Sequence, residues 1–470
     1  MGVDLMSDLP KGWTECSLGE IIVSKKGKKP KSTIKEFRKG YIPYILIDEM
    51  EGKPIRAYTN DNSVQLIHRN DVLLVWDGSI GKCGSGIEGA IGSTLVGLSP
   101  LGGIPTKFLE YTIKQLTNFI KGTSTGTGLQ HINKDFFKIC KIVLPPLNEQ
   151  ERIAAKLDKL LSKVETAKTR LDLILQILKR FRQSVLSAAV SGELTKEWRA
   201  KNSFERNIGD FVETIKRERE CFCKSDKEIN KFHNSFEYTV NIENKWLEIK
   251  AELVCDFITK GTTPKYLLEK GDIPFLKVYN IIEDSIDFNY KPQFVDTKTH
   301  KGFLKRSIVY PNDILMNIVG PPLGKVAIVT SQFNEWNINQ ALAIFRPIKS
   351  LLPNYLYYFL KDGSPITQIL LDTKGIVGQS NISLEQCRNI MINIPSIEEQ
   401  KEIVRRVEQL FKFADQIEAR YNKAKQYADK LTQSLLAKAF RGELVPQDPN
   451  DEPAEKLLER IKSGKKHSLL

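Results

Sequence analysis

The sequence predicts an α+β protein in which two similar α/β domains are separated by a long antiparallel two-helix coiled coil, with internal pseudo-two-fold symmetry. Three observations support this prediction. One helical signature occurs twice, an apolar heptad pattern accompanies each copy, and the blocks before the two copies resemble each other loosely. With 470 residues, of which 41% are hydrophobic, the chain can fill two or more cores.

The helical repeat begins at PPLNEQERI, residues 145–153, which matches PSIEEQKEI, residues 395–403. It ends at QSVLSAAVSGEL, residues 183–194, which matches QSLLAKAFRGEL, residues 433–444. The offset between the copies is constant, so the two segments align without a gap. Two copies of one unit are therefore predicted.

Apolar residues recur along each copy at alternating spacings of four and three, which is typical of a coiled-coil seam. We expect each helix to begin after Pro146 or Pro395 and to end at Gly192 or Gly442, where glycine can adopt the left-handed cap conformation. About 40 residues at 1.5 Å each make a rod of roughly 60 Å. The predicted seam residues are Ile153, Leu157, Leu160, Val164, Leu171, Leu178, Ile403, Val407, Leu410, Ile417, Leu431 and Leu435.

Each apolar stripe needs a partner, which could be the other stripe or a second chain. Two matched stripes in one chain favour internal pairing. A parallel pair would crowd the two preceding blocks at one end, so an antiparallel pair is predicted. Beyond each glycine, FVETIK (211–216) and LLERIK (457–462) indicate a short docking helix that ends each unit.

The two blocks share residues at matching places while their loops differ. Runs such as IPYILI, DVLLVW and KVAIV predict strands, and KFLEYTIKQL and PNYLYYFLKD predict helices, so each block is expected to be α+β. The matched pairs are Trp13 with Trp246, Gly27 with Gly261, Pro30 with Pro264, Asn70 with Asn312, Asp71 with Asp313, Gly81 with Gly324, and Lys82 with Lys325.

The net charge is +13 and the pI is near 9.1, which favours a polyanionic partner such as nucleic acid, although an ordinary basic protein can have the same composition. Residues 24–39, SKKGKKPKSTIKEFRK, contain eight Lys or Arg and one Glu, interrupted by Gly27 and Pro30. We interpret this segment as a flexible basic loop that can lie along phosphates.

Motifs for catalysis are missing from the sequence. GSIGK (78–82) and GPPLGK (320–325) are too short for a phosphate-binding loop, and Cys83 or Val326 follows where a Mg²⁺-binding hydroxyl belongs. No catalytic residue is therefore predicted.

Metal sites and membrane segments are not expected either. Cys221 and Cys223 with His233 lack a second ligand pair. Seven irregularly spaced cysteines, without a signal peptide or membrane span, indicate a cytoplasmic protein.

The doubled helix from EQ to GEL, the opening LPKGW, and the stretches 126–130 and 375–379 resemble the specificity subunit of type I restriction-modification systems. The resemblance covers nearly the whole chain. It implies a non-catalytic subunit whose two target recognition domains read a split, asymmetric site in double-stranded DNA. It also implies partners, namely methyltransferase subunits (expected to be two) that modify adenines, and translocating restriction subunits. Those partners are expected to use S-adenosylmethionine, ATP and Mg²⁺, while this chain needs no cofactor.

The repeat and the resemblance together divide the chain into six parts. These are target recognition domain 1 (1–146), spacer helix 1 (147–194), a connecting segment with a short helix (195–244), target recognition domain 2 (245–396), spacer helix 2 (397–445), and a C-terminal tail with a short docking helix (446–470).

Loop lysines in both blocks are expected to contact phosphates, which gives a salt-dependent affinity with little sequence preference. These are Lys25, Lys26, Lys28, Lys29, Lys31, Lys82, Lys260, Lys265 and Lys325. Amide and hydroxyl side chains on the same loops are candidates for reading base edges, although each could be an ordinary turn residue. They are Gln130, Asn133, Thr262, Thr263, Gln379 and Asn381.

Two other classes of function fit parts of the sequence. One is a structural coiled-coil adaptor without a DNA role, which a gel-shift with purified chain and partner would distinguish. The other is an enzyme fused to its own recognition domains, which a methyl-transfer assay on the isolated chain would distinguish. The missing catalytic motifs oppose the second class.

The paired helices are expected to act as a ruler. Deleting one matched heptad from both helices removes about 10 Å of rod, and should shorten the unread gap between the half-sites by up to about three base pairs at about 3.4 Å each. Mapping the methylated bases in cells that express the chain and its partners measures the gap. An unchanged gap would contradict the ruler.

Overall fold

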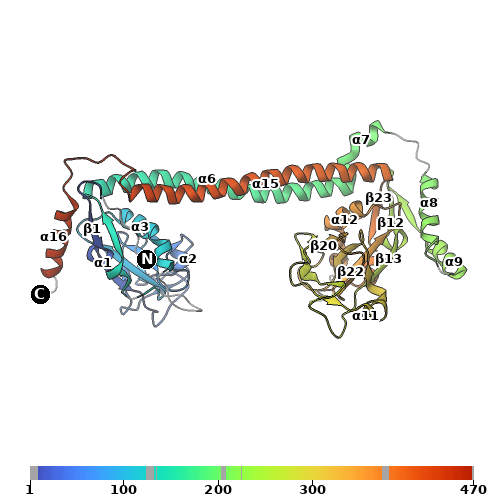
Figure 1. Cartoon of the computed structure of the whole chain (residues 1–470), viewed down its shortest axis with the longest axis horizontal. Coiled ribbons are helices and arrows are strands. Elements are labelled where there is room, and N and C mark those ends of the chain that lie inside the picture. Colours follow the sequence, from blue (N-terminus) through green and yellow to red (C-terminus); the bar gives the residue numbers. More distant parts are fainter. Residues whose placement is uncertain are drawn as a thin grey trace. The chain divides into compact units, whose positions relative to one another are not determined.

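A computed structural model of the chain describes residues 9–122, 132–133, 135–202, 208–223, 225–372 and 381–467 (Figure 1). The chain divides into two compact units, unit 1 with Met1–Leu173 and Tyr421–Leu470, and unit 2 with Ile174–Arg420. Each unit contains one of the predicted blocks and part of both long helices, α6 (Leu147–Ser191) and α15 (Ile397–Ala439). In the described residues, no helix combines the length and apolarity that a membrane crossing requires.

Unit 1 is built around a four-stranded antiparallel sheet with the order β2-β9-β6-β7. Its strands are β2 (Ile22–Lys26), β9 (Leu95–Pro100), β6 (Val72–Val75) and β7 (Cys83–Ser85). Successive β6 side chains enter different cores, because Val72 and Leu74 pack with α3 (Thr106–Gln115) while Leu73 and Val75 pack on the opposite face. The sheet is therefore buried on both faces.

A second sheet of unit 1 has the order β4-β3-β8-β5 and includes the parallel pair β3–β8. Its strands are β4 (Tyr58–Thr59), β3 (Ile42–Ile45), β8 (Gly89–Ile91) and β5 (Leu66–Ile67). The chain leaves this sheet through β8 and enters the first one through β9 after the short turn 92–94.

Unit 2 repeats both sheets, which confirms the repeat predicted from the sequence. The first has the order β13-β22-β19-β20, from β13 (Cys255–Lys260), β22 (Leu342–Pro347), β19 (Ile314–Asn317) and β20 (Val326–Ile328). The second has the order β17-β14-β21-β18, from β17 (Phe294–Val295), β14 (Ile273–Leu276), β21 (Trp336–Ile338) and β18 (Ile308–Val309), with β14 and β21 parallel. Helix α12 (Pro353–Lys361) corresponds to α3.

A small antiparallel sheet connects each block to its long helix. In unit 1 it pairs β1 (Thr14–Ser17) with β10 (Lys141–Leu144). In unit 2 it joins β11 (Tyr238–Val240), β12 (Leu247–Lys250) and β23 (Met391–Ile394). The strand that precedes α6 or α15 is thus anchored before the helix begins.

The smaller elements lie between these strands. The short helices are α1 (Leu18–Ile21), α2 (Ile47–Met50), α4 (Thr117–Gly122), α5 (Phe136–Ile139), α7 (Lys196–Lys201), α9 (Asp226–Ser235), α10 (Ala251–Val254), α11 (Thr297–Lys301), α13 (Ser364–Asp372) and α14 (Leu384–Arg388). The described residues also form 3₁₀ turns at Glu193–Thr195, Val278–Asn280 and Lys305–Ser307, and a hairpin of β15 (Ile281–Ile282) with β16 (Ser285–Ile286).

The long helices pair antiparallel within each unit, as predicted. In unit 1, Lys168 forms an ion pair with Asp429 at 2.6 Å, and Asp172, one turn further along α6, pairs with Lys425 at 3.2 Å, one turn earlier on α15. In unit 2, the Arg182 guanidinium lies 2.7 Å from Asp415, and Arg406 donates to the backbone oxygen of Leu194 at 2.8 Å. Higher numbers on the first helix thus meet lower numbers on the second.

The seam differs from the heptad prediction near the end of α15. Ile153, Leu157, Val164, Leu178, Ile403 and Val407 are buried, and Leu160, Leu171, Leu410, Ile417 and Leu435 are half-buried. The assignment of Leu431 to the seam was wrong, because this side chain is 48% exposed, whereas Leu436 and Ala439 are buried. A helix with 3.6 residues per turn drifts by about 20° per heptad relative to a strict seven-residue repeat, so its buried face moves to neighbouring positions.

The long helices end at Ser191 and Ala439, one and three residues before the predicted glycine stops. Gly192 and Gly442 have φ of 85° and 74°, so the predicted left-handed glycine stops are confirmed. The predicted docking helices are also present. Helix α8 (Ile208–Glu220) buries Val212 and Ile215 in the core of unit 2, and α16 (Ala454–His467) packs Leu457 and Ile461 into the core of unit 1.

The EQ pair that opens each long helix is buried and joins the helix to its block. Trp13 Nε1 donates to Glu149 Oε2 at 3.0 Å, and Trp246 Nε1 donates to Glu399 Oε2 at 3.1 Å. The following glutamine donates to the backbone oxygen five residues earlier, Gln150 to Pro145 at 2.9 Å and Gln400 to Pro395 at 3.0 Å. The repeated motif is therefore an anchor between sheet and helix.

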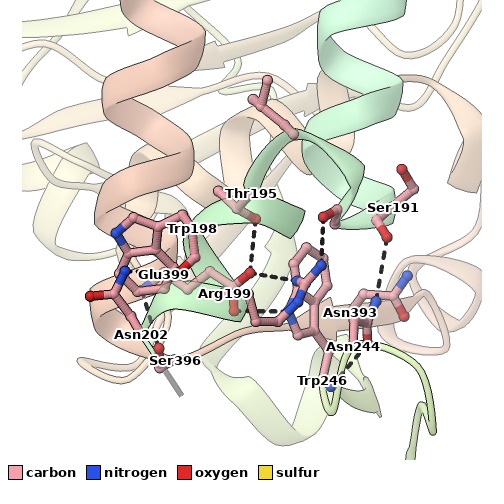
Figure 2. A network of polar contacts seen from close by, with 12 residues as sticks. Ser191, Thr195, Trp198, Arg199, Asn202, Asn244, Trp246, Asn393, Ser396 and Glu399 are labelled. Carbon is pink, nitrogen blue, oxygen red and sulfur yellow. Dashed lines mark hydrogen bonds and ion pairs between the residues drawn. The ribbon is translucent and has the colours of Figure 1, made fainter. Parts of the chain in front are cut away.

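The second carboxylate oxygen distinguishes the two copies. Figure 2 shows that Glu399 Oε1 receives hydrogen bonds from Thr195 Oγ1 at 2.8 Å and from Arg199 at 2.6 Å. Val445 replaces Thr195 in the other copy. Glu149 Oε1 is buried and has no hydrogen-bond partner among the described residues, and burial raises the pKa of Glu149 above its ordinary value.

The two anchors should respond oppositely to the same substitution. Glu399→Gln leaves the Arg199 guanidinium without its carboxylate and should lower the free energy of unfolding by about 2–3 kcal/mol. Glu149→Gln removes a poorly compensated buried carboxylate and should leave that free energy unchanged or raise it at neutral pH. Urea denaturation followed by tryptophan fluorescence measures both, with exposed Glu398→Gln as the control. Equal losses at positions 149 and 399 would contradict this distinction.

The effect of Glu149→Gln should depend on pH. Because the folded-state pKa of Glu149 lies above the ordinary 4.5, ionisation disfavours the folded state as pH rises through that ordinary value. The stability of the variant relative to the native chain should therefore increase from about pH 4 toward neutrality. Unfolding curves across this range measure the difference in free energy of unfolding between the two chains. A difference that does not change with pH would contradict a raised pKa of Glu149.

Candidate nucleic-acid interface

One edge of the first sheet in unit 1 gathers most of the predicted contact residues of that unit. Since neighbouring strands are antiparallel, the ends of β2 and β6 meet the starts of β9 and β7 at this edge. Lys26 Nζ, at the end of β2, lies 2.6 Å from Asp77 Oδ2 after β6 and over the Trp76 ring at 5.6 Å. Ile132 N donates to Trp76 O at 3.2 Å, which brings Asn133 to the same edge. We call this region, made by 26–31, 76–82, 92–94 and 132–133, polar edge 1.

Unit 2 builds the same edge from the corresponding segments. Gly261 N donates to Leu342 O at 3.0 Å, and Thr262 N donates to Ile338 O at 3.2 Å. Asn381 forms an isolated β-bridge with Val319 in the turn after β19. We call this region, made by 260–265, 318–325, 339–341 and 381–382, polar edge 2.

Each edge requires a glycine at the start of its first loop. A Cβ on Gly27 would lie 2.0 Å from the backbone oxygen of Gly92, and one on Gly261 would lie 2.1 Å from that of Asn339. No side chain fits at these distances, so only glycine allows the loop to cross the neighbouring turn. Gly27 and Gly261, which the sequence repeat matches with each other, thus mark the place where two loops of each edge touch.

The predicted phosphate contacts fall into two groups. Lys28, Lys29, Lys31, Lys260 and Lys265 are exposed on the edges, while Lys25 is half-buried. Three others already have partners. Lys26 pairs with Asp77 at 2.6 Å, Lys82 pairs with Glu51 at 2.5 Å, and Lys325 donates to the backbone oxygen of Ile281 at 3.2 Å. A phosphate would have to compete with these partners, so the first group is more accessible to a polyanion.

The predicted base-reading residues also differ in their surroundings. Asn133 is exposed, but its Oδ1 accepts from Asp135 N at 2.9 Å, as a turn residue does. Thr262 is half-buried, whereas Thr263 and Asn381 are exposed. Gln130 and Gln379 lie outside the described residues.

The second sheet in each unit also contributes residues to the polar edge, which the sequence did not predict. Asn339 N donates to Leu276 O at 3.0 Å, which places Lys277 and Tyr279 beside polar edge 2. The matching turn after β3 in unit 1 carries Asp48 and Glu49. The parallel strand pairs that bring these turns to the edges join segments far apart in the chain, so no local pattern reveals them.

These matching turns, an α-helical turn in unit 1 and a 3₁₀ turn in unit 2, share one capping hydrogen bond but carry different side chains. Leu46 N donates to Glu49 Oε2 at 3.1 Å, and Lys277 N donates to Asn280 Oδ1 at 3.0 Å. In unit 1, Arg56 lies 2.6 Å from Asp48, and a hydrogen bond from Lys53 holds the pKa of Asp48 below its ordinary value. In unit 2, Lys277 instead lies over the ring of Tyr279 at 5.9 Å. Two similar scaffolds thus present different functional groups.

The turns that carry GSIGK and GPPLGK are ordinary hairpin connections. GSIGK and GPPLGK form the hairpin turns between β6 and β7 and between β19 and β20. Within the described part of the chain, no group of three or more His, Cys, Asp or Glu side chains is arranged to hold a metal ion.

Comparison with known proteins agrees with this arrangement. The family described as type I restriction modification DNA specificity domain matches residues 10–176 and 243–426. The type I restriction enzyme EcoDI specificity subunit of Escherichia coli is 30% identical over 467 residues, covering 97% of this chain and 96% of that protein. The EcoBI specificity subunit, also from Escherichia coli, is 35% identical over 367 residues, covering 76% of this chain and 71% of that protein.

A chain with the same fold occurs in a solved structure that concerns complex assembly and conformational transition of the type I R-M system. Its TM-score is 0.66 at 19% identity, over 93% of this chain and 100% of that chain. The family match occurs twice, once on each unit's block and the helix that follows it. The chain therefore belongs to the type I restriction-modification DNA specificity family and is a non-catalytic specificity subunit that recognises DNA sequence.

Proposed function

We propose that polar edge 1 and polar edge 2 each read one half-site of a bipartite, asymmetric sequence in double-stranded DNA. The observation that carries this proposal is the duplication of one edge with unlike side chains. The shared elements are the glycine crossing and the hairpin turn, and the differing elements are the turns after β3 and β14. Similar scaffolds with different polar groups suit two different half-sites.

The exposed lysines of the edges supply the affinity in this proposal. Lys28, Lys29 and Lys31 follow the glycine crossing on an exposed loop of unit 1, and Lys260 and Lys265 flank the crossing in unit 2. Ammonium groups at these positions attract phosphates of either strand and release counterions, without choosing a sequence. Sequence choice then comes from the shorter side chains between them.

The partners belong to the same proposal. The chain would dock methyltransferase subunits, expected to be two, and restriction subunits in the cytoplasm. The partners would carry S-adenosylmethionine, ATP and Mg²⁺ and perform the chemistry. Purification of the coexpressed subunits and measurement of their ratio tests the stoichiometry.

Removing the three exposed lysines that follow Gly27 should weaken DNA binding without changing the sequence that is recognised. The triple variant Lys28→Ala, Lys29→Ala and Lys31→Ala should flatten the slope of log affinity against log salt by roughly 2 to 3. Titration of labelled DNA with the chain and its methyltransferase subunits at several salt concentrations measures the slope. Methylation mapping should still report the native sequence.

The control variant removes the same number of positive charges away from the polar edges. It replaces three exposed lysines of unit 2 with alanine, namely Lys201, Lys227 and Lys231. Its salt slope should match that of the native chain. Equal slopes for both triple variants would contradict a DNA contact by the three lysines of polar edge 1.

A further inference from the structure

A hydrogen bond on polar edge 2 holds one glutamine in a defined orientation. Thr263 Oγ1 donates to Gln340 Oε1 at 2.6 Å, and both side chains are exposed. Gln340 occupies the middle of the turn 339–341 between β21 and β22, and Thr263 lies in the loop after β13. The bond therefore links the two loops that cross at Gly261.

The backbone on both sides of this bond is fixed. Gly261 and Thr262 donate to the backbone oxygens of Leu342 and Ile338 at 3.0 and 3.2 Å. Leu342 N in turn donates to Asn339 O at 3.2 Å, which closes the turn that carries Gln340. Neither side chain depends on a freely moving loop, so the pair is organised before any ligand binds.

The orientation of the side-chain amide determines whether Gln340 presents a hydrogen-bond donor or an acceptor. A free glutamine amide can turn either its oxygen or its nitrogen toward a ligand. In the structure the Thr263 hydroxyl donates to Oε1, so the Nε2 donors face away from Thr263. Nε2 makes no hydrogen bond to another of the described residues, so its two N–H groups remain available on an exposed surface.

We infer that Gln340 is a specificity-determining residue of unit 2 and that Thr263 is its positioning residue. The inference rests on the proposed function and refines it. The amide donates to a base that presents a hydrogen-bond acceptor in the major groove, which guanine, adenine and thymine do. Cytosine presents only its N4 donor there, so the pair excludes cytosine at one position. Thr263, assigned above to base reading, acts through Gln340 instead.

Unit 1 lacks this pair at the corresponding positions. The glycine crossings match Gly27 with Gly261 and Gly92 with Asn339, so that Lys29 corresponds to Thr263 and Ser93 to Gln340. A lysine next to a serine cannot form the same amide clamp. Only the half-site read by unit 2 should therefore depend on it.

The test maps methylation by the chain coexpressed with its methyltransferase subunits, on a plasmid library in which the half-sites are randomised. Gln340→Ala should raise the use of cytosine at one base position by on the order of tenfold, while the other half-site and the gap stay unchanged. Thr263→Val, which removes the hydroxyl at constant shape, should relax the same position to a smaller degree. Thr263→Ser, which keeps the hydroxyl, should keep the native base preference.

Gln332→Ala is the matched control. Gln332 is an exposed glutamine in the loop between β20 and β21, at the opposite edge of the same sheets. This variant should methylate the native sequence.

Two results would overturn the inference. One is an unchanged base preference in Gln340→Ala. The other is a general loss of methylation by a Gln340→Ala chain that still unfolds like the native protein, because a residue that reads one base leaves the rest of the site usable. Failure of the proposed function is distinct from both, since the native chain itself would then show no bipartite methylated sequence.

Discussion

The hydrogen bond between a buried indole and a buried glutamate at the start of each long helix is the contact on which the rest of each unit depends. Trp13 with Glu149 and Trp246 with Glu399 join the first strand of a block to the first turn of the helix that follows it. The neighbouring glutamine then binds the backbone before the helix. A buried donor or acceptor left without its partner is costly, so this geometry admits little change in the angle between sheet and helix.

The second constraint lies at the other side of each block, where a glycine lets two loops cross at the polar edge. The Cβ distances at Gly27 and Gly261 leave room for no other residue. Because the crossing is a backbone feature, the side chains on the loops around it are free to differ. This explains how the two units keep one scaffold while one carries Asp48, Glu49 and Arg56 and the other carries Lys277 and Tyr279.

The two buried glutamates of the repeat do not contribute equally to stability. Glu399 binds Thr195 and Arg199 in addition to the indole, whereas Glu149 retains a buried oxygen without a partner among the described residues. The difference follows from the residues after each GEL sequence, TKEWR in one copy and VPQDP in the other. Equivalent positions in a repeat therefore need not contribute equally to stability, even where the motif itself is identical.

The sequence by itself determined the repeat, most of the seam of the long helices and their glycine stops, because each of these follows from a periodic or local signal. It also determined their antiparallel pairing, because each helix directly follows a large block that a parallel pair would crowd. It also located the matched glycines Gly27 and Gly261 and the exposed lysines beside them. Only the tertiary structure decided that Leu431 leaves the seam, that the turns after β3 and β14 join the polar edges, and that Thr263 holds Gln340. Those features depend on helix drift, on parallel strand pairing between distant segments and on the crossing of two loops. Local residue patterns do not determine such long-range contacts.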